Sequence, residues 1–146
     1  SADIDETKRA TAIEAGEKKV YDPSEKGVVD RILSESQGRV YAVVDFVGSE
    51  DSVNFGRQCL GRGGRLVLVG LFGGAIQIDL PLFTLQGHSI VGSITGSLEE
   101  AKEVLKLAKS GKLDPIPIEK RFLNKANEAL DDLRAGRIFG RVVLTP

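Results

Sequence analysis

The stretch that decides the fold covers residues 41–70 and reads YAVVDFVGSEDSVNFGRQCLGRGGRLVLVG. It holds two short apolar, β-branched runs, each ending in a glycine, and the helix-compatible segment Glu50–Cys59 joins them. Strands that are apolar on both faces are typical of parallel sheets covered by helices, and a connection of this length suits a βαβ crossover. The stretch therefore predicts an α/β fold with a parallel sheet.

The same stretch also predicts where a ligand would bind. In open parallel sheets, ligands bind beyond the carboxyl ends of the strands. Those ends carry Phe46-Val47-Gly48 after the first run and Val69-Gly70-Leu71 after the second. We therefore expect these two tripeptides to line a common binding cleft.

The rest of the chain continues the alternation of helices and strands. Asp22-Pro23 introduces one expected helix, with Pro23 in its first turn. Ser97 and Glu100 have the spacing of a capping box and begin another. The remaining expected elements are helices at 7–15 and 125–135 and strands at 19–21, 89–93, 118–122 and 141–144.

Composition excludes several classes of protein. The chain has 146 residues, a net charge of −1, 41% hydrophobic and 28% charged residues, as expected for one globular domain. No basic field indicates binding to nucleic acid or to an anionic membrane. The longest apolar run, Leu66–Phe72, is far shorter than the roughly 20 residues of a membrane span. A lone cysteine fits a reducing cytoplasm. The chain begins with serine and contains no methionine, so we expect it to be a piece of a longer protein.

Two residues near the beginning are candidates for binding. An acid at the end of the second strand of a dinucleotide-binding sheet accepts hydrogen bonds from the adenosine ribose and repels a 2′-phosphate, which favours NAD over NADP. Asp3 could have this place, but spacing alone favours the interpretation of Asp3 as a solvated helix N-cap. Lys8 could reach the same ribose or lie on the surface.

Other polar residues have structural interpretations. The glycine-rich Gly61–Gly64 follows a helix and precedes a strand, which indicates a turn, and no GxGxxG motif follows any strand. Asp45 lies in an apolar strand and needs a partner such as a backbone amide. Cys59 is expected to be buried and His88 to lie at a solvent-facing turn. Neither has a neighbour at metal-binding spacing.

Together, the segments resemble the carboxyl-terminal half of the medium-chain dehydrogenase/reductase family, in particular its zinc-type alcohol dehydrogenases. The residues that carry the resemblance are spread over nearly the whole chain: 2–5 with Lys8 and Arg9, 43–48, 64–70, 89–93 and 136–144. The resemblance implies a Rossmann-like, doubly wound parallel sheet. Residues 1–146 would form a partial dinucleotide-binding domain that lacks the first strand and its glycine-rich turn.

The resemblance also implies the cofactor, NAD, and the residues that bind it. Asp3 would bind the ribose, with Lys8 nearby, and Arg141 would bind the pyrophosphate. The remaining positions would line the two ends of the cofactor: Phe46, Val47 and Gly48 on the adenine and ribose side, and Val69, Gly70, Leu71, Ser93 and Ile94 on the nicotinamide side.

The implied activity belongs to a larger protein. The intact enzyme would transfer hydride between an alcohol and NAD, with catalytic zinc held by an amino-terminal part that is missing here. This chain would supply no catalytic residue or metal ligand and would be inactive alone. Alternatives are a zinc-free quinone or enoyl reductase of the same family, or a non-catalytic Rossmann-like binding domain. The expected partners are the missing part, which would fill the gap in the sheet, and a second copy joined through Ser89–Ser93.

Overall fold

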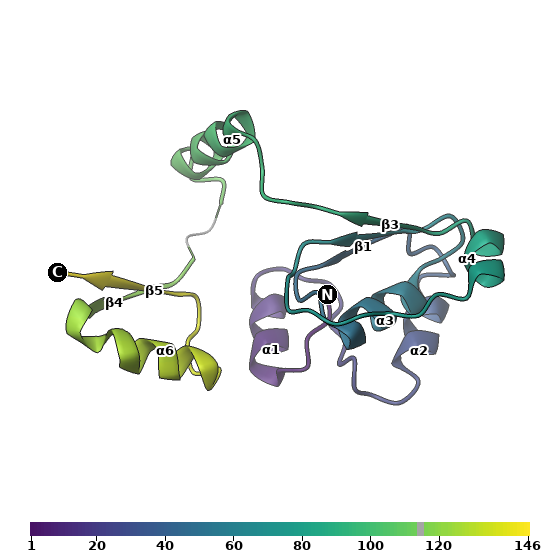
Figure 1. Cartoon of the computed structure of the whole chain (residues 1–146), viewed down its shortest axis with the longest axis horizontal. Coiled ribbons are helices and arrows are strands. Elements are labelled where there is room, and N and C mark those ends of the chain that lie inside the picture. Colours follow the sequence, from purple (N-terminus) through teal and green to yellow (C-terminus); the bar gives the residue numbers. More distant parts are fainter. Residues whose placement is uncertain (114–115) are drawn as a thin grey trace. The chain divides into compact units, whose positions relative to one another are not determined.

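The computed structural model describes residues 1–113 and 116–146. It divides the chain into two compact units, residues 1–94 and residues 95–146, and each is described by itself (Figure 1). The first unit contains α1 (Glu6–Glu14), α2 (Val28–Glu35), β1 (Ala42–Asp45), α3 (Glu50–Cys59), β2 (Arg65–Leu68), α4 (Leu80–Gln86) and β3 (Ser89–Gly92). The second contains α5 (Leu98–Lys109), β4 (Ile118–Phe122), the 3-10 turn η1 (Leu123–Lys125), α6 (Ala126–Arg134) and β5 (Arg141–Thr145).

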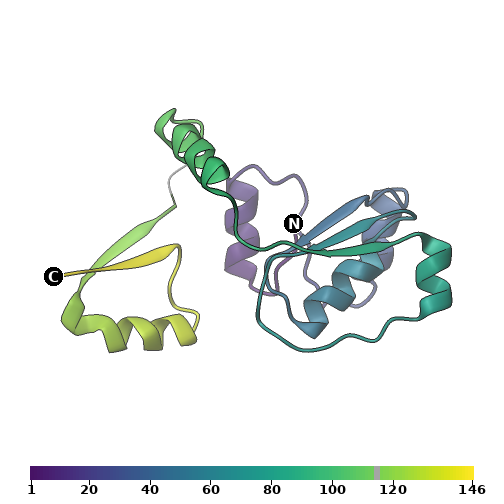
Figure 2. The same ribbon diagram turned by 45° about the horizontal axis from the view of Figure 1, so that its top comes forward.

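The sheet of the first unit confirms the predicted parallel βαβ architecture. Its strand order is β1-β2-β3 and both pairings are parallel, with α3 connecting β1 to β2. The register aligns Val44 with Val67 and Val67 with Val91, so a row of valines crosses one face of the sheet. Figure 2 shows the three strands side by side, with α3 on one side of the sheet.

The core of this unit lies between the sheet and its covering helices. Leu66 of β2 is fully buried and packs with Val53 of α3 and with Leu60. Gly56 lets α3 approach the sheet closely, because a Cβ there would lie 3.0 Å from a methyl group of Val43. A second apolar cluster joins α2 to α3 through Val28, Ile32 and Cys59.

The amino-terminal segment forms an isolated parallel bridge between Ala2 and Tyr21, and Arg9 forms an ion pair with Asp22 at 3.2 Å. The amide of Asp3 donates to the carbonyl of Tyr21, 3.2 Å away. An isolated bridge thus stands where a short strand was predicted at 19–21. Among the described residues, β1 is paired only with β2, so its other edge carries no strand.

Of two helix starts predicted from the sequence, one is confirmed and the other is wrong. Ser97 and Glu100 form the predicted capping box, each side chain accepting the other residue's amide. The predicted place of Pro23 is wrong, because α2 begins five residues later, after Gly27. The carboxylate of Asp22 instead accepts the amide and the hydroxyl of Ser24, a local turn that competes with helix formation.

The second unit is small and is built on one parallel strand pair. β4 pairs with β5, and α6 connects them along the chain. Ala129 of α6 is the one buried apolar residue among the described positions of this unit. Arg121 of β4 is bonded to Asp132 of α6 at 2.7 Å, which ties the helix to the strand pair.

Within the described part of the chain, no helix combines the length and the apolar character that crossing a membrane requires.

Candidate functional site

The loops after β1 and β2 extend the pairing of the two strands beyond the sheet. The amides of Val69 and Gly70 both donate to the carbonyl of Asp45, at 2.9 and 3.0 Å. Farther on, the amide of Phe72 donates to Val47 and that of Gly73 to Gly48. These hydrogen bonds flank the two predicted tripeptides and hold their loops together at one edge of the sheet.

Two glycines make this close approach possible. Gly48 has φ +70, a left-handed conformation that side chains disfavour, and a Cβ there would lie 2.0 Å from the carbonyl oxygen of Gly70. A Cβ on Gly70 would in turn lie 2.1 Å from the carbonyl carbon of Val47. The prediction that both tripeptides border the same region is consistent with this contact.

Asp45 has the backbone-amide partners that its buried position predicts. Asp45 is only 6% exposed. Its Oδ1 accepts the amides of Val47 and Gly48 at 2.8 and 3.1 Å. Its Oδ2 accepts the hydroxyl of Ser52, in the first turn of α3, at 2.8 Å. Ser52 also completes a capping box with Ser49.

The side chains at this edge are apolar and exposed. Phe46 is 75% exposed, Val47 53% and Leu71 96%. Beside them lies a hollow of about 270 Å³ between the start of α3 and the loop after β2, lined by residues 48–50, 53, 68, 70, 71 and 73–76. Exposed apolar side chains beside a hollow suit the flat faces of a nucleotide.

Asp3 is oriented by the beginning of α1 without being its N-cap. The cap is Asp5, whose Oδ1 accepts the amide of Lys8 at 3.1 Å, so the interpretation of Asp3 as the cap is wrong. Oδ1 of Asp3 accepts the amide of Asp5, and the carbonyl of Asp3 accepts Arg9 Nη1 at 2.7 Å. Oδ2 of Asp3 has no hydrogen-bond partner within residues 1–113 and 116–146.

The remaining predicted residues, Lys8, Ser93, Ile94 and Arg141, are exposed. The side chain of Lys8 is exposed, and Ser93 and Ile94 follow β3 at the end of the first unit with their side chains exposed. Arg141 begins β5 in the second unit, exposed, with Nη1 donating to the carbonyl of Gly140. Whether Arg141 joins the other candidates at one cofactor stays a prediction.

The residues given structural interpretations behave largely as expected. Cys59 is buried, and this burial raises its pKa to about 11, so the thiol is unreactive at neutral pH. Gly61–Gly64 forms a turn, with the amide of Gly64 donating to Gly61. His88 was expected at a solvent-facing turn but is half-buried, its Nε2 lying 3.1 Å from the carbonyl of Gly61.

No described cluster of three or more histidine, cysteine, aspartate or glutamate side chains could hold a metal ion. The side chains that the structure describes therefore do not fit a zinc site.

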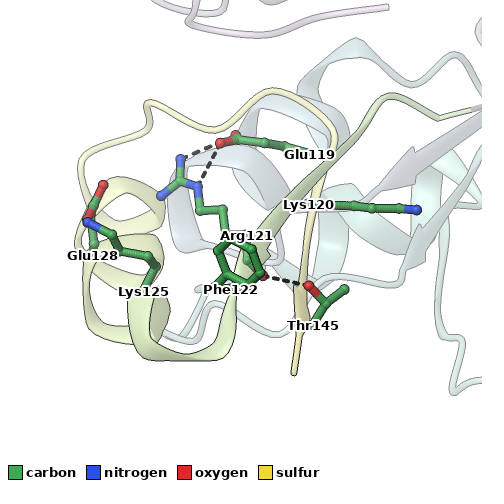
Figure 3. Close-up of a pocket in the computed structure, with 7 residues that line it drawn as sticks. All are labelled: Glu119, Lys120, Arg121, Phe122, Lys125, Glu128 and Thr145. Carbon is green, nitrogen blue, oxygen red and sulfur yellow. Dashed lines mark hydrogen bonds and ion pairs between the residues drawn. The ribbon is translucent and has the colours of Figure 1, made fainter.

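A second hollow, of about 370 Å³, lies in the second unit (Figure 3). It is lined by Glu119, Lys120, Arg121, Phe122, Lys125, Glu128 and Thr145. Arg121 holds the pKa of Glu119 below its usual range, and Arg121 and Arg137 do the same for Asp132. The arginine charge is thus already neutralised by two carboxylates, so this hollow is a weaker candidate for binding an anion.

Sequence reasoning missed the contribution of Ser49, Ser52 and Gly73 to the first site. The signal for Ser52 was present, since a serine in the first turn of a crossover helix follows a buried aspartate. Gly73 pairs with Gly48 through a contact between loops, which local sequence does not reveal.

Comparison with known proteins identifies the family of the chain. A family model described as zinc-binding dehydrogenase matches residues 1–110. An NAD-dependent alcohol dehydrogenase of Sulfurisphaera tokodaii is 33% identical over 145 residues, which are 99% of this chain and 42% of that protein. A D-arabinose 1-dehydrogenase (NADP(+)) of Saccharolobus solfataricus is 32% identical over 138 residues, 94% of this chain and 39% of that protein.

The fold is also found in solved structures. The crystal structure of the alcohol dehydrogenase from Aeropyrum pernix matches 99% of this chain and 42% of its own, with 32% identity and a TM-score of 0.89. The chain thus spans less than half the length of these relatives, and its parallel sheet is the Rossmann-like sheet of alcohol dehydrogenase structures. The chain belongs to the zinc-binding dehydrogenase family, of which it represents the carboxyl-terminal part.

Proposed function

We propose that this chain is the NAD-binding portion of an NAD-dependent alcohol dehydrogenase. The full-length enzyme would transfer hydride between an alcohol and NAD, with the catalytic zinc held by another part of the protein. Membership of the family and the names of the relatives support this proposal. The glycine-rich edge formed by the loops after β1 and β2 gives the cofactor a place to bind.

The observation that carries the choice of cofactor is the geometry of Asp3. One carboxylate oxygen is fixed by the amide of Asp5, and the other has no partner in the described chain. A half-buried carboxylate with one oxygen held and one available suits a bond from a ribose hydroxyl. Its charge would repel the extra phosphate of NADP.

The other candidates would contact the cofactor mainly through apolar surface and backbone. Phe46 and Val47 would lie against the adenine and ribose, whereas Val69, Gly70, Leu71, Ser93 and Ile94 would border the nicotinamide. Lys8 would lie near the ribose and Arg141 would pair with the pyrophosphate. Bound NAD supplies the hydride acceptor, and the residues of this chain orient it and shield it from water.

Substitution of Asp3 tests this proposal. We expect Asp3→Asn in the full-length protein to raise the Kd for NADH about tenfold and to weaken discrimination against NADPH, because a charged hydrogen bond is lost. Asp5→Asn is the matched control, since it changes the nearby helix cap and keeps the Asp3 carboxylate. An unchanged NADH/NADPH preference in Asp3→Asn would contradict the assignment.

The D-arabinose dehydrogenase named for NADP(+) keeps NADP open as the alternative cofactor. Fluorescence titration with both nucleotides separates the two, since an NADP-dependent protein binds NADPH more tightly than NADH. A zinc-free reductase of the same family would bind the nucleotide equally well and would retain activity after zinc is removed by a chelator.

We also propose two partners and a compartment. The amino-terminal part of the same protein would add a strand at the free edge of β1, and a second copy would join through Ser89–Ser93. Light scattering of the full-length protein would show a dimer or larger oligomer, and a monomer would contradict the second proposal. The lone buried cysteine makes the reducing cytoplasm the expected compartment.

A further inference from the structure

The geometry points to Asp45, assisted by Ser52, as a positioning residue of the cofactor site. We infer that its carboxylate fixes the backbone of Val47 and Gly48 against Gly70, and that NAD affinity depends on this arrangement. The inference rests on the proposed function, because it assigns a role to the same site. Asp45 itself would not touch the cofactor.

The burial of Asp45 requires an explanation. Burying an ionised carboxylate costs several kcal/mol unless hydrogen bonds or charges compensate it. Asp45 is 6% exposed, and no ion pair within the described residues involves it. Its partners are two amides and one hydroxyl, all within eight residues along the chain.

These bonds complete a two-sided arrangement around Val47 and Gly48. The amides of both residues donate to Asp45 Oδ1, and their carbonyls accept the amides of Phe72 and Gly73. Every backbone polar group of Val47 and Gly48 therefore has a partner. Without the carboxylate, one side of this arrangement would be lost.

The position of the loop after β1 matters because the loop after β2 lies directly against it. Gly48 is in a left-handed conformation at φ +70, with the backbone of Gly70 directly against it. The exposed side chains of Val47 and Leu71 are attached to these same two loops. A shift of either loop would displace the surface that receives the cofactor, and a loosened loop must be ordered again on binding.

Ser52 links this arrangement to α3. Its hydroxyl donates to Asp45 Oδ2 at 2.8 Å and accepts the amide of Ser49 at 3.0 Å. The beginning of the helix, the carboxylate and the loop are thus one connected network. Removal of the Ser52 hydroxyl should weaken the network without leaving the two loop amides unpaired.

The experiment compares four variants of the full-length protein: Asp45→Ala, Asp45→Asn, Ser52→Ala and the control Asp51→Asn. Asp51 is an exposed carboxylate in the first turn of the same helix, outside the network. Two quantities are measured, namely hydrogen exchange at the amides of Val47 and Gly48 without nucleotide, and the Kd for NADH.

We expect Asp45→Ala to speed exchange at both amides and to raise the Kd for NADH about tenfold, because the acceptor of two bonds is lost. Ser52→Ala should raise the Kd about threefold. Asp45→Asn should stay within about twofold of the unchanged protein, since its amide oxygen still accepts both amides. Asp51→Asn should change neither quantity.

The two measurements separate failure of this inference from failure of the proposed function. If Asp45→Ala frees the amides but leaves the Kd unchanged, Asp45 is only structural and the inference is overturned. If Asp45→Ala does not fold, the Kd of Ser52→Ala for NADH is the test instead. An unchanged Kd in Ser52→Ala would also overturn the inference. If the unsubstituted protein binds neither NADH nor NADPH, the proposed function fails and the inference fails with it.

Discussion

Leu66 of β2 and Arg121 of β4 can be compared, because each lies on a strand of its own unit and its side chain contacts the helix beside that strand. Leu66 is fully buried among apolar side chains of α3 and β3, whereas Arg121 is bonded to Glu119 and Asp132. The first unit therefore depends on apolar burial and on bonds between its loops, and the second depends more on ion pairs. The proposed binding edge lies in the unit with the apolar core, where a loop can be held accurately.

The largest effect is expected from Leu66→Ala. Removing a fully buried leucine leaves a cavity, and we expect a loss of about 3 kcal/mol in the free energy of unfolding of the first unit. Urea denaturation followed by the amide signals of β1 and β2 measures it. Leu71→Ala is the matched control, since Leu71 is 96% exposed and should change stability by less than about 0.5 kcal/mol. Equal losses of stability in Leu66→Ala and Leu71→Ala would contradict the claim that the first unit depends on apolar burial.

A smaller effect is expected from Gly48→Ala. An alanine at φ +70 is strained, and its Cβ would clash with the Gly70 carbonyl, so we expect a loss of about 2 kcal/mol together with weaker NADH binding. Gly63→Ala, in the turn before β2, has a similar backbone strain at φ +75 but no atom within 4 Å of its Cβ. It should therefore keep the NADH affinity. Loss of affinity in both variants would show that the close contact is not what matters.

The smallest effect is expected from Arg121→Met, which removes the ion pairs while keeping most of the side-chain volume. We expect the second unit to melt at a lower temperature, with a difference that shrinks at about 1 M salt. Arg134→Met is the control, because Arg134 is exposed and so is its partner Asp131. An equal shift in both variants would contradict a special role for Arg121.

The ion pairs of Arg121 also predict a dependence on pH. The pKa values of Glu119 and Asp132 are lowered in the folded state, so their stabilisation is complete above the ordinary values of 4.5 and 3.8. It is lost as the pH falls through the lowered values. Acid titration of the second unit should therefore show less stability below about pH 4. Arg121→Met should reduce this dependence.

The sequence predicted most of this fold because its signals were local. The β-branched runs around residues 41–47 and 64–70 marked β1 and β2, and the Ser97 capping box marked the start of α5. The prediction that Pro23 lies in the first turn of a helix is wrong because the Asp22 side chain forms a turn with Ser24. Proline suits such a turn as well as a first helical turn. The prediction that His88 lies at a solvent-facing turn is wrong because its partner, Gly61, is distant in the sequence.

The site was predictable only in part. The rule for parallel sheets indicated that the loops after β1 and β2 lie together, as they do, whereas their binding of a cofactor stays a prediction. The apolar strand around Asp45 indicated that its carboxylate needs an amide partner. The pairing of Val47 with Phe72 and of Gly48 with Gly73 joins two loops far apart in sequence, so no local pattern reveals it. The roles of Asp3 and Arg141 at a cofactor remain predictions.

We propose that NAD binds both to Asp3 and to the edge formed by the loops after β1 and β2. The most direct measurement is the change in amide NMR signals when NADH is added to the isotope-labelled full-length protein. The largest changes are predicted at Asp3, at Phe46–Gly48 and at Gly70–Leu71. Binding of NADH that leaves these signals unchanged, or that changes only residues elsewhere, would contradict the claim.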